Sequence, residues 1–459
     1  MQWLRVVLVS FMVAGFLAGC DAQPPETAKK EAPVSDAESK YKVPKHPDVP
    51  VEVKEAAKPD AAAKRETPAE RDDAANEVGQ PEGEISETPP PAPPRVEALN
   101  KTPPVAEKNT VKKPRFRQFE VHDAEKEGFH KVRVFYGTNR NQTGNEEANY
   151  YYGKTRGSMT FGVCEVAIPL THVEGKLEAP KWWKMEFSED PTKHVMLQKV
   201  RSMSWKALAS ELNETLARSS GRNAFVFVHG YNVSFKDAAR RTAQIHHDLK
   251  FDGAPIFFSW PSRGEITLTS YTHDETNAKW SYSYLKDFLV RVATNTDADN
   301  LYLVAHSMGT RVLSNAVANI ISERPDLKKR FKEIILAAPD IDADVFVNDL
   351  APKLVEASRN TTLYAASDDR ALQTSREVHG GYPRAGDAGD NLIILKGIDT
   401  VDATGVDVSL LRHSYFAEAN SIIRDIKEIV GLAKPARERT YLLLNKREND
   451  GLEFFTVKK

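Results

Sequence analysis

The serine at position 307 lies in the pentapeptide Ala305-His306-Ser307-Met308-Gly309. An apolar run rich in branched side chains precedes it, and a pattern typical of a helix resumes within two residues. A serine on such a tight strand-to-helix turn projects its hydroxyl from the sheet, and the helix amino terminus favours negative charge beside it. The pentapeptide fits the pattern G-x-S-x-G with alanine in place of the first glycine. We therefore predict that Ser307 is a nucleophile.

A nucleophilic serine needs a base, and the base needs an acid that orients it. In a parallel sheet of this kind the acid follows a later strand than the nucleophile. Asp368 and Asp369 come directly after the apolar run 361–367, and either of them fits this position. Asp340 ends an earlier run and is a rival, which we interpret as a loop or pocket residue, with Asp342 as the cap of the next helix.

The base is expected on a loop after the last strand, just before the closing helix. His413, in the stretch DVSLLRHSYF, occupies that place. His379 is the alternative, although it precedes the last predicted strand at 391–397.

An oxyanion hole needs backbone N–H groups that point at the developing negative charge. Met308 directly follows the nucleophile and supplies one of them. The second is expected from Tyr231 or Asn232, in the loop FVHGYNVSF, where Gly230 allows the backbone to turn closely. Its His-Gly pair is similar to the corresponding loop of lipases and esterases.

Aromatic residues and one acid are mixed in the segment after the predicted strand 254–259. Trp260, Tyr271 and Asp274 occur here, together with Trp280 and Tyr282. Two interpretations stay open. These residues form a cap over a substrate pocket, with an apolar grip and some polar selection, or they pack a long helix onto the sheet.

Apolar strand-like and amphipathic helix-like segments alternate from about residue 116 onward. The predicted strands are 131–138, 159–169, 194–201, 223–230, 254–261, 300–307, 333–340, 361–367 and 391–397. The predicted helices are 204–220, 234–251, 277–294, 309–325 and 414–430, and the tail 440–459 resembles a hairpin. Wholly apolar strands alternating with helices indicate an α/β fold with a mostly parallel sheet covered on both faces.

As an ordered set, seven motifs between about Lys131 and Glu428 resemble a bacterial branch of the alpha/beta-hydrolase superfamily whose function is unknown. They are VFYGTNR, FVHGYNVSF, FFSWPS, AHSMGTRVL, LAAPDID, YAASDDRAL and RHSYF. The resemblance implies the alpha/beta-hydrolase fold, esterase- or lipase-like activity, Ser307 as nucleophile, His413 as base and Asp369 as the acid, with Asp368 as the alternative. It fixes no substrate.

The first twenty residues are predicted to be a signal peptide of a lipoprotein. Arg5 precedes an apolar run that is too short to span a bilayer easily, and Leu17-Ala18-Gly19-Cys20 resembles a lipobox. Cleavage before Cys20 and lipid attachment to its sulfur would anchor the chain in a membrane, facing the periplasm of the cell envelope. Asp21 resembles a signal for retention in the inner membrane.

Residues 21–115 are predicted to be a disordered tether, which leaves 116–459 as the hydrolase domain. The segment holds 17 of the 27 prolines and a single aromatic residue, so it cannot bury enough apolar surface to offset the entropy of ordering it. A net charge of −2 argues against nucleic acid as a partner.

The sequence contains no metal-ligand spacing, no phosphate-binding glycine loop and no dinucleotide fingerprint, so no metal and no cofactor is expected. The favoured hypothesis is a lipid-anchored serine hydrolase that acts on a small acyl ester or a lipid-like substrate. The alternative is a non-catalytic envelope lipoprotein that uses the same fold to bind a partner or a lipid.

Overall fold

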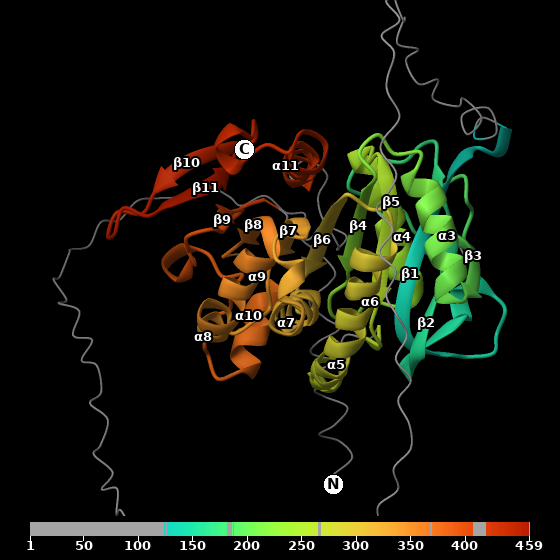
Figure 1. Cartoon of the computed structure of the whole chain (residues 1–459), viewed down its shortest axis with the longest axis horizontal. Helices are drawn as coiled ribbons and strands as arrows, with labels where there is room; N and C mark the ends of the chain where they lie inside the picture. Colours follow the sequence, from blue (N-terminus) through green and yellow to red (C-terminus); the bar gives the residue numbers. More distant parts are fainter. Residues whose placement is uncertain are drawn as a thin grey trace, which may run out of the picture. The chain divides into compact units, whose positions relative to one another are not determined.

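The computed structural model describes residues 124, 126–180, 186, 188–264, 268–367, 370–406 and 419–458. The predicted signal peptide 1–20 with Cys20, Asp21 and the predicted tether 21–115 lie outside these residues. The described residues form an eleven-stranded sheet with helices on both faces (Figure 1). This architecture confirms the predicted α/β fold.

The strands lie in the order β10-β11-β9-β8-β7-β6-β4-β5-β1-β2-β3. They are β1 (Phe129–Gln142), β2 (Tyr152–Pro169), β3 (Met196–Met203), β4 (Asn223–Val228), β5 (Gly253–Ser259), β6 (Asn300–His306), β7 (Phe331–Ala337), β8 (Ser358–Ala365), β9 (Asp399–Asp402), β10 (Leu442–Lys446) and β11 (Glu453–Val457). Neighbouring strands from β1 to β11 across the centre pair in parallel, and the antiparallel pairs are β1–β2, β2–β3 and β10–β11. Most of the sheet is therefore parallel.

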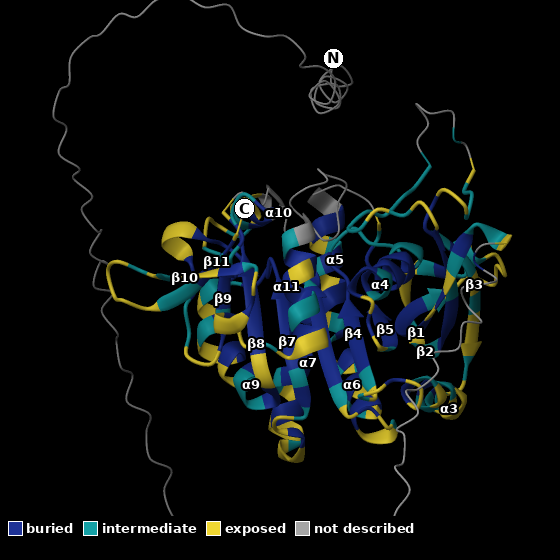
Figure 2. Cartoon of the chain, turned by 90° about the horizontal axis from the view of Figure 1, so that it is seen from above, coloured by how far each residue is buried: buried dark blue, intermediate teal, exposed yellow. Residues whose placement is uncertain are grey.

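The helices cover the sheet on both sides. They are α3 (Trp205–Leu216), α4 (Phe235–Leu249), α5 (Leu268–Trp280), α6 (Tyr282–Asn295), α7 (Met308–Glu323), α8 (Ala343–Val345), α9 (Ala351–Ala357), α10 (Arg370–Val378) and α11 (Ala419–Leu432). Side chains of α3, α6, α7 and α9 pack on one face, and those of α4 and α11 pack on the other. Figure 2 shows that the strands between these layers are almost entirely buried.

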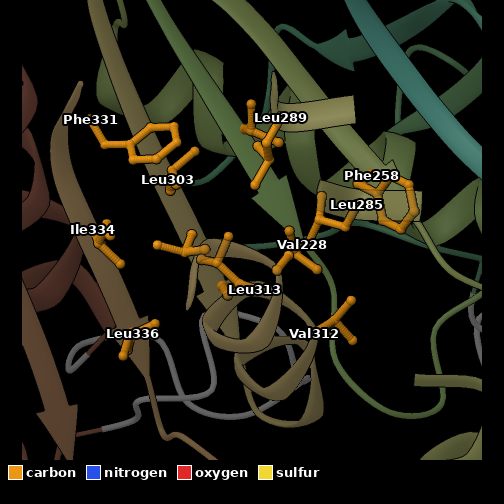
Figure 3. Close-up of a cluster of buried hydrophobic side chains, with 14 of the residues drawn as sticks. Val228, Phe258, Leu285, Leu289, Leu303, Val312, Leu313, Phe331, Ile334 and Leu336 are labelled. Carbon is orange, nitrogen blue, oxygen red and sulfur yellow. The ribbon is translucent and has the colours of Figure 1, made fainter. Parts of the chain in front are cut away.

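The central strands β4, β5, β6 and β7 are apolar over most of their length because helices cover both faces. In β4, Val226 packs with the α6–α7 layer, whereas Phe225 and Phe227 pack with the α4 layer. Figure 3 shows Val312 and Leu313 of α7 among side chains of β4, β6 and β7. Each buried side chain of this kind contributes about 1.5–3 kcal/mol, so the start of α7 is held firmly on the sheet.

The predicted strand at 391–397 is wrong, and the strand that pairs with β8 is β9, two residues later. The apolar run turns instead of extending, since the amide of Ile398 donates to the carbonyl oxygen of Leu395. Leu392 and Ile393 pack as buried side chains on the core. The strand itself has the sequence DTVD, which is too short and too polar to be recognised from an apolar pattern.

The segment that follows β5 is helical over most of its described length, and the predicted helix 277–294 is in fact the end of α5 followed by α6. The buried side of α5 is polar. Asn277 donates to the carbonyl oxygen of Pro261 at 2.7 Å, and Ser281, between the two helices, accepts from Asn139 at 2.9 Å. Because these contacts replace an apolar stripe, the sequence pattern did not indicate the helix.

The predicted C-terminal hairpin is confirmed. β10 and β11 pair antiparallel around a turn in which Gly451 has a φ of 71°. β11 also pairs in parallel with β9, so the hairpin extends the main sheet. No helix among the described residues is long and apolar enough to span a lipid bilayer.

A buried ion cluster fastens the loop after β2 to α4. The two ring nitrogens of His172 lie 2.8 Å from carboxylate oxygens of Glu178 and Asp248. Burial alone would lower the pKa of His172, but hydrogen bonds and charge attraction from the two carboxylates raise it to about 9.

Candidate active site

Ser307 occupies a strained turn between β6 and α7. Its backbone has φ 51° and ψ −129°, a conformation that residues other than glycine rarely adopt. Its amide donates to the carbonyl oxygen of Ala337 at 3.0 Å, which ties the turn to the end of β7. The side chain is half-buried at the carboxyl end of the central strand. This is the geometry that the pentapeptide predicts.

The glycine after the nucleophile is required by close packing. A Cβ atom at Gly309 would lie 2.5 Å from the carbonyl oxygen of Val228 and closer still to that of His229. Real Cβ atoms essentially never approach so closely. The first turn of α7 therefore rests directly on the end of β4, and Met308, at the first position of α7, has its N–H beside the nucleophile.

The loop after β4 lies against Ser307. A Cβ atom at Gly230 would be 3.0 Å from the Cβ atom of Ser307, so the two backbones are in contact distance. Asn232 has φ 58°, in the left-handed region. Its N–H makes a long hydrogen bond of 3.5 Å to Asp274 Oδ2. Of the two predicted loop donors, Asn232 is thus directed toward Asp274, which favours Tyr231 as the donor at the site.

Trp260 packs against His229, the residue that follows β4. It is fully buried, and its indole N–H donates to the carbonyl oxygen of His229 at 2.8 Å. The ring of His229 stacks on the indole at 5.1 Å between centroids. Burial, with the charge of Arg140, lowers the pKa of His229 to about 3, so the ring is neutral. Trp260 therefore packs the scaffold of the site and is enclosed from solvent.

Tyr271 and Asp274, the other two residues predicted to line a pocket, project from α5 toward the site and are also buried. The ring of Tyr271 lies 5.3 Å from that of Tyr231. Asp274 accepts a hydrogen bond of 2.5 Å from Ser262 Oγ and one of 2.9 Å from the amide of Arg263. Both side chains are packed against the loops around Ser307 and are largely enclosed from solvent.

Asp340, the rival acid, is enclosed by donors. Its carboxylate accepts hydrogen bonds from Ser375 at 2.5 Å, Tyr271 at 2.6 Å, Arg384 at 3.1 Å and Arg311 at 3.2 Å. Burial alone would raise the pKa of Asp340, but the two guanidinium groups lower it to about 2. Asp340 is thus a buried, permanently charged anchor between α5, α7 and α10. Asp342 caps α8, as predicted, by accepting from two backbone amides.

His379, the alternative base, follows α10 and faces its own partners. Its Nδ1 lies 2.7 Å from the carbonyl oxygen of Ser375 and 3.3 Å from Arg384 Nη2. Its Nε2 lies 3.3 Å from Glu275, whose carboxylate also pairs with Arg311 at 2.6 Å.

The three remaining predicted residues of the triad, Asp368, Asp369 and His413, lie outside the described residues. The described strands that precede these residues in the sequence, β8 and β9, run parallel to β6, the strand that ends directly before Ser307. β6, β7, β8 and β9 are consecutive parallel neighbours, so their carboxyl ends share one edge of the sheet. The chain from β8 to α10 holds the two aspartates, and the chain from β9 to α11 holds the histidine. The assignment of the acid and the base stays a prediction.

Sequence reasoning missed the role of Arg140. This side chain is buried, and its guanidinium donates to Ser259 Oγ and to the carbonyl oxygens of Gly153, Ser262 and Val233, at 2.7–3.2 Å. Burial lowers the pKa of Arg140 to about 9, although the charge of Asp274 acts in the opposite direction. The motif VFYGTNR marked the residue, but its partners lie in β2, at the end of β5, in the segment after β5 and in the loop after β4.

Within the described ranges, no three histidine, cysteine, aspartate or glutamate side chains come together in an arrangement that could hold a metal ion.

Residues 204–431 match the model of a family described as an alpha/beta hydrolase of unknown function (DUF900). Comparison with curated proteins found no match. Solved structures with a similar course of the chain include a protein of Lactobacillus plantarum WCFS1 named as a cell surface hydrolase, with 10% identity and a TM-score of 0.28, which covers 46% of this chain and 92% of that one. Lipase B of Aspergillus fumigatus has 12% identity and a TM-score of 0.28, over 46% of this chain and 53% of that one. A fungal esterase of Rhizomucor miehei has 12% identity and a TM-score of 0.27, over 60% and 79%.

Proposed function

Because the chain belongs to the alpha/beta-hydrolase superfamily, we propose that it is a serine hydrolase that cleaves a carboxylic ester or a related acyl bond. The observation that carries the proposal is the backbone of Ser307, which is held at a positive φ with the loop of Gly230 directly against it. Strain of this kind persists where the surrounding structure enforces it, and it is common at catalytic sites.

In this mechanism the hydroxyl of Ser307 attacks the carbonyl carbon of the substrate while His413 accepts its proton. Asp369 orients the imidazole and stabilises its positive charge. The N–H groups of Met308 and Tyr231 hold the negative charge that develops on the carbonyl oxygen. His413 then protonates the departing alcohol, which leaves the acyl group on Ser307. In the second half of the reaction His413 accepts a proton from water, the water attacks the acyl carbon, and His413 returns the proton to the departing Ser307 oxygen, so that the acid is released.

A fluorophosphonate probe, which reacts covalently with activated serines, tests the nucleophile on the purified full-length chain. Wild type and Ser322→Ala are expected to be labelled alike, since Ser322 is exposed on the same helix and its hydroxyl donates to the carbonyl oxygen of Ala318. Ser307→Ala is expected to lose the label. Equal labelling of Ser307→Ala would rule out Ser307 as the nucleophile.

The acid and the base are tested by ester hydrolysis. His413→Ala and Asp369→Asn are each expected to lower kcat by about 10⁴-fold, as expected when a triad loses its base or the group that orients it. Asp368→Asn is the matched control and is expected to stay within a few-fold of wild type. The reverse result for the two aspartates would assign the acid to Asp368. A series of p-nitrophenyl esters, with a thioester and an amide of the same acyl group, defines the bond and chain length.

We further propose that the protein is attached to a membrane of the cell envelope through lipid on Cys20. The lipobox-like stretch before Cys20 supports this proposal. Metabolic labelling with an alkyne-bearing palmitate is expected to mark wild type and to spare Cys20→Ser. Fractionation of the two membranes tests the role of Asp21, since Asp21→Ser is expected to move the protein from the inner to the outer membrane.

A further inference from the structure

Two buried polar side chains contact the loop that follows β4. Asp274 is fully buried on α5, and Arg140 is buried at the end of β1. Among the described residues, Arg140 hydrogen-bonds to carbonyl, hydroxyl and imidazole groups and to no carboxylate, so the charge of Asp274 acts on it without a direct ion pair. A buried charge without a direct counter-ion is costly, and it is retained only where its hydrogen bonds fix the surrounding chain.

Both side chains form hydrogen bonds with the same short loop. Arg140 Nη2 donates to the carbonyl oxygen of Val233 at 2.7 Å, and Asp274 Oδ2 accepts from the amide of Asn232 at 3.5 Å. Ser262 joins the two halves. Its Oγ donates to Asp274 at 2.5 Å and accepts from the amide of Val233 at 3.2 Å, while its carbonyl oxygen accepts from Arg140 at 2.9 Å.

This loop needs external support because of its backbone conformation. Asn232 is held at φ 58°, in the left-handed region, which residues with a side chain adopt less readily than negative φ. Without the hydrogen bond to its amide, the loop would relax toward negative φ. The peptide groups that precede it, including the N–H of Tyr231, would then move away from Ser307, against which Gly230 is packed.

We propose that Arg140 and Asp274, joined through Ser262, are positioning residues that clamp the loop 230–234 so that its N–H group faces the oxyanion formed at Ser307. The inference rests on the proposed serine hydrolase function. It reassigns Asp274 from contact with substrate to support of the catalytic backbone, and it gives a role to the arginine of VFYGTNR.

Kinetics of the full-length chain test the clamp. Asp274→Asn and Ser262→Ala are expected to lower kcat about 10- to 100-fold with KM changed less than about threefold, because a displaced oxyanion donor acts on the transition state. The affinity for a trifluoromethyl ketone, which forms an oxyanion on the serine, is expected to fall by the same factor as kcat/KM. The control is Asp299→Asn, which breaks an exposed ion pair with Arg222 at the opposite edge of the sheet and is expected to change none of these values. A rise in KM with kcat and ketone affinity unchanged would overturn the proposal in favour of direct substrate contact by Asp274.

Hydrogen exchange separates failure of the clamp from failure of the proposed function. Peptides that cover 229–234 are expected to exchange at least tenfold faster in Asp274→Asn, Ser262→Ala and Arg140→Lys than in wild type, whether or not the protein hydrolyses an ester. Unchanged exchange in these peptides would refute the clamp, even in an active enzyme. If the wild type neither reacts with a fluorophosphonate nor cleaves esters, and these peptides still exchange faster in the variants than in wild type, the clamp is upheld and the serine hydrolase function is rejected. If Arg140→Lys does not fold, Ser262→Ala removes one hydroxyl only and decides the question.

Discussion

Replacing Gly309 by alanine is a sharp test of how the nucleophile turn is built. The new Cβ atom would lie 2.5 Å from the carbonyl oxygen of Val228, whereas contacts under 3.0 Å essentially never occur. The first turn of α7 must therefore move away from β4 by at least about 0.5 Å, since neither partner is a flexible side chain.

Two consequences follow from a shift of this size. Overpacking at such a site costs about 1–3 kcal/mol of folding free energy, equivalent to a fall in Tm of roughly 1.5–4.5 °C for a domain of this size, whose unfolding entropy is about 2.1 cal/mol/K per residue. A misplacement of about 1 Å at a catalytic group costs on the order of 100-fold in rate, so half of that displacement predicts a loss of about tenfold. The shift separates the N–H of Met308 from the loop of Gly230, which must act on the same oxygen.

The assay is the rate of fluorophosphonate labelling of the full-length chain, measured beside thermal unfolding. Gly431→Ala is the matched control, because Gly431 lies in α11 with no atom within 4 Å of the added Cβ. That variant is expected to keep the labelling rate and to gain about 0.5–1 kcal/mol of stability from helix propensity. A Gly309→Ala protein with the labelling rate and Tm of wild type would refute the close-packing argument.

Three other predictions concern stability. Ser307→Gly is expected to be inactive and yet to have a higher Tm than Ser307→Ala, because glycine adopts the positive φ of 51° without strain; a lower Tm would mean that the turn is not strained. For His172, the folded-state pKa of about 9 exceeds the unfolded value of about 6.5, so its contribution is complete below pH 6.5 and is lost as the pH rises through about 9. Urea unfolding between pH 6 and pH 10 is expected to show this loss in wild type, and to lack that part of the pH dependence in His172→Gln. Trp260→Phe is expected to lose about 1–3 kcal/mol in urea unfolding, because the carbonyl oxygen of His229 stays buried without its donor; an unchanged midpoint would show that water replaces the indole.

The central sheet could be predicted because its strands carry an unusually clear signal. β4, β6 and β7 are apolar on both faces, and each ends in a glycine, serine or aspartate motif at the site edge. The turn at Ser307 could be predicted for the same reason, since a strand, a small residue and a helix meet within a few positions.

Other parts could not be predicted because their buried contacts are polar. The helix α5 turns Asp274 and Asn277 toward the sheet, where they bond to loops, so it lacks the apolar period that identifies a helix. The short strand β9 is identified by its pairing with β8 and β11, and its own four residues give no sign of that pairing. The role of Arg140 becomes visible only where the loop after β4 and the end of β5 with its following segment meet at one guanidinium group.

The attachment of the C-terminal hairpin to β9 has a consequence for biosynthesis. β9 is four residues long and, until β11 pairs with it, one side of its backbone has no strand neighbour. Those peptide groups stay available to other chains until β11 has left the ribosome and folded back onto β9. A chain truncated before Leu442 would leave this side of β9 unpaired, and such a fragment is expected to aggregate through the uncovered strand.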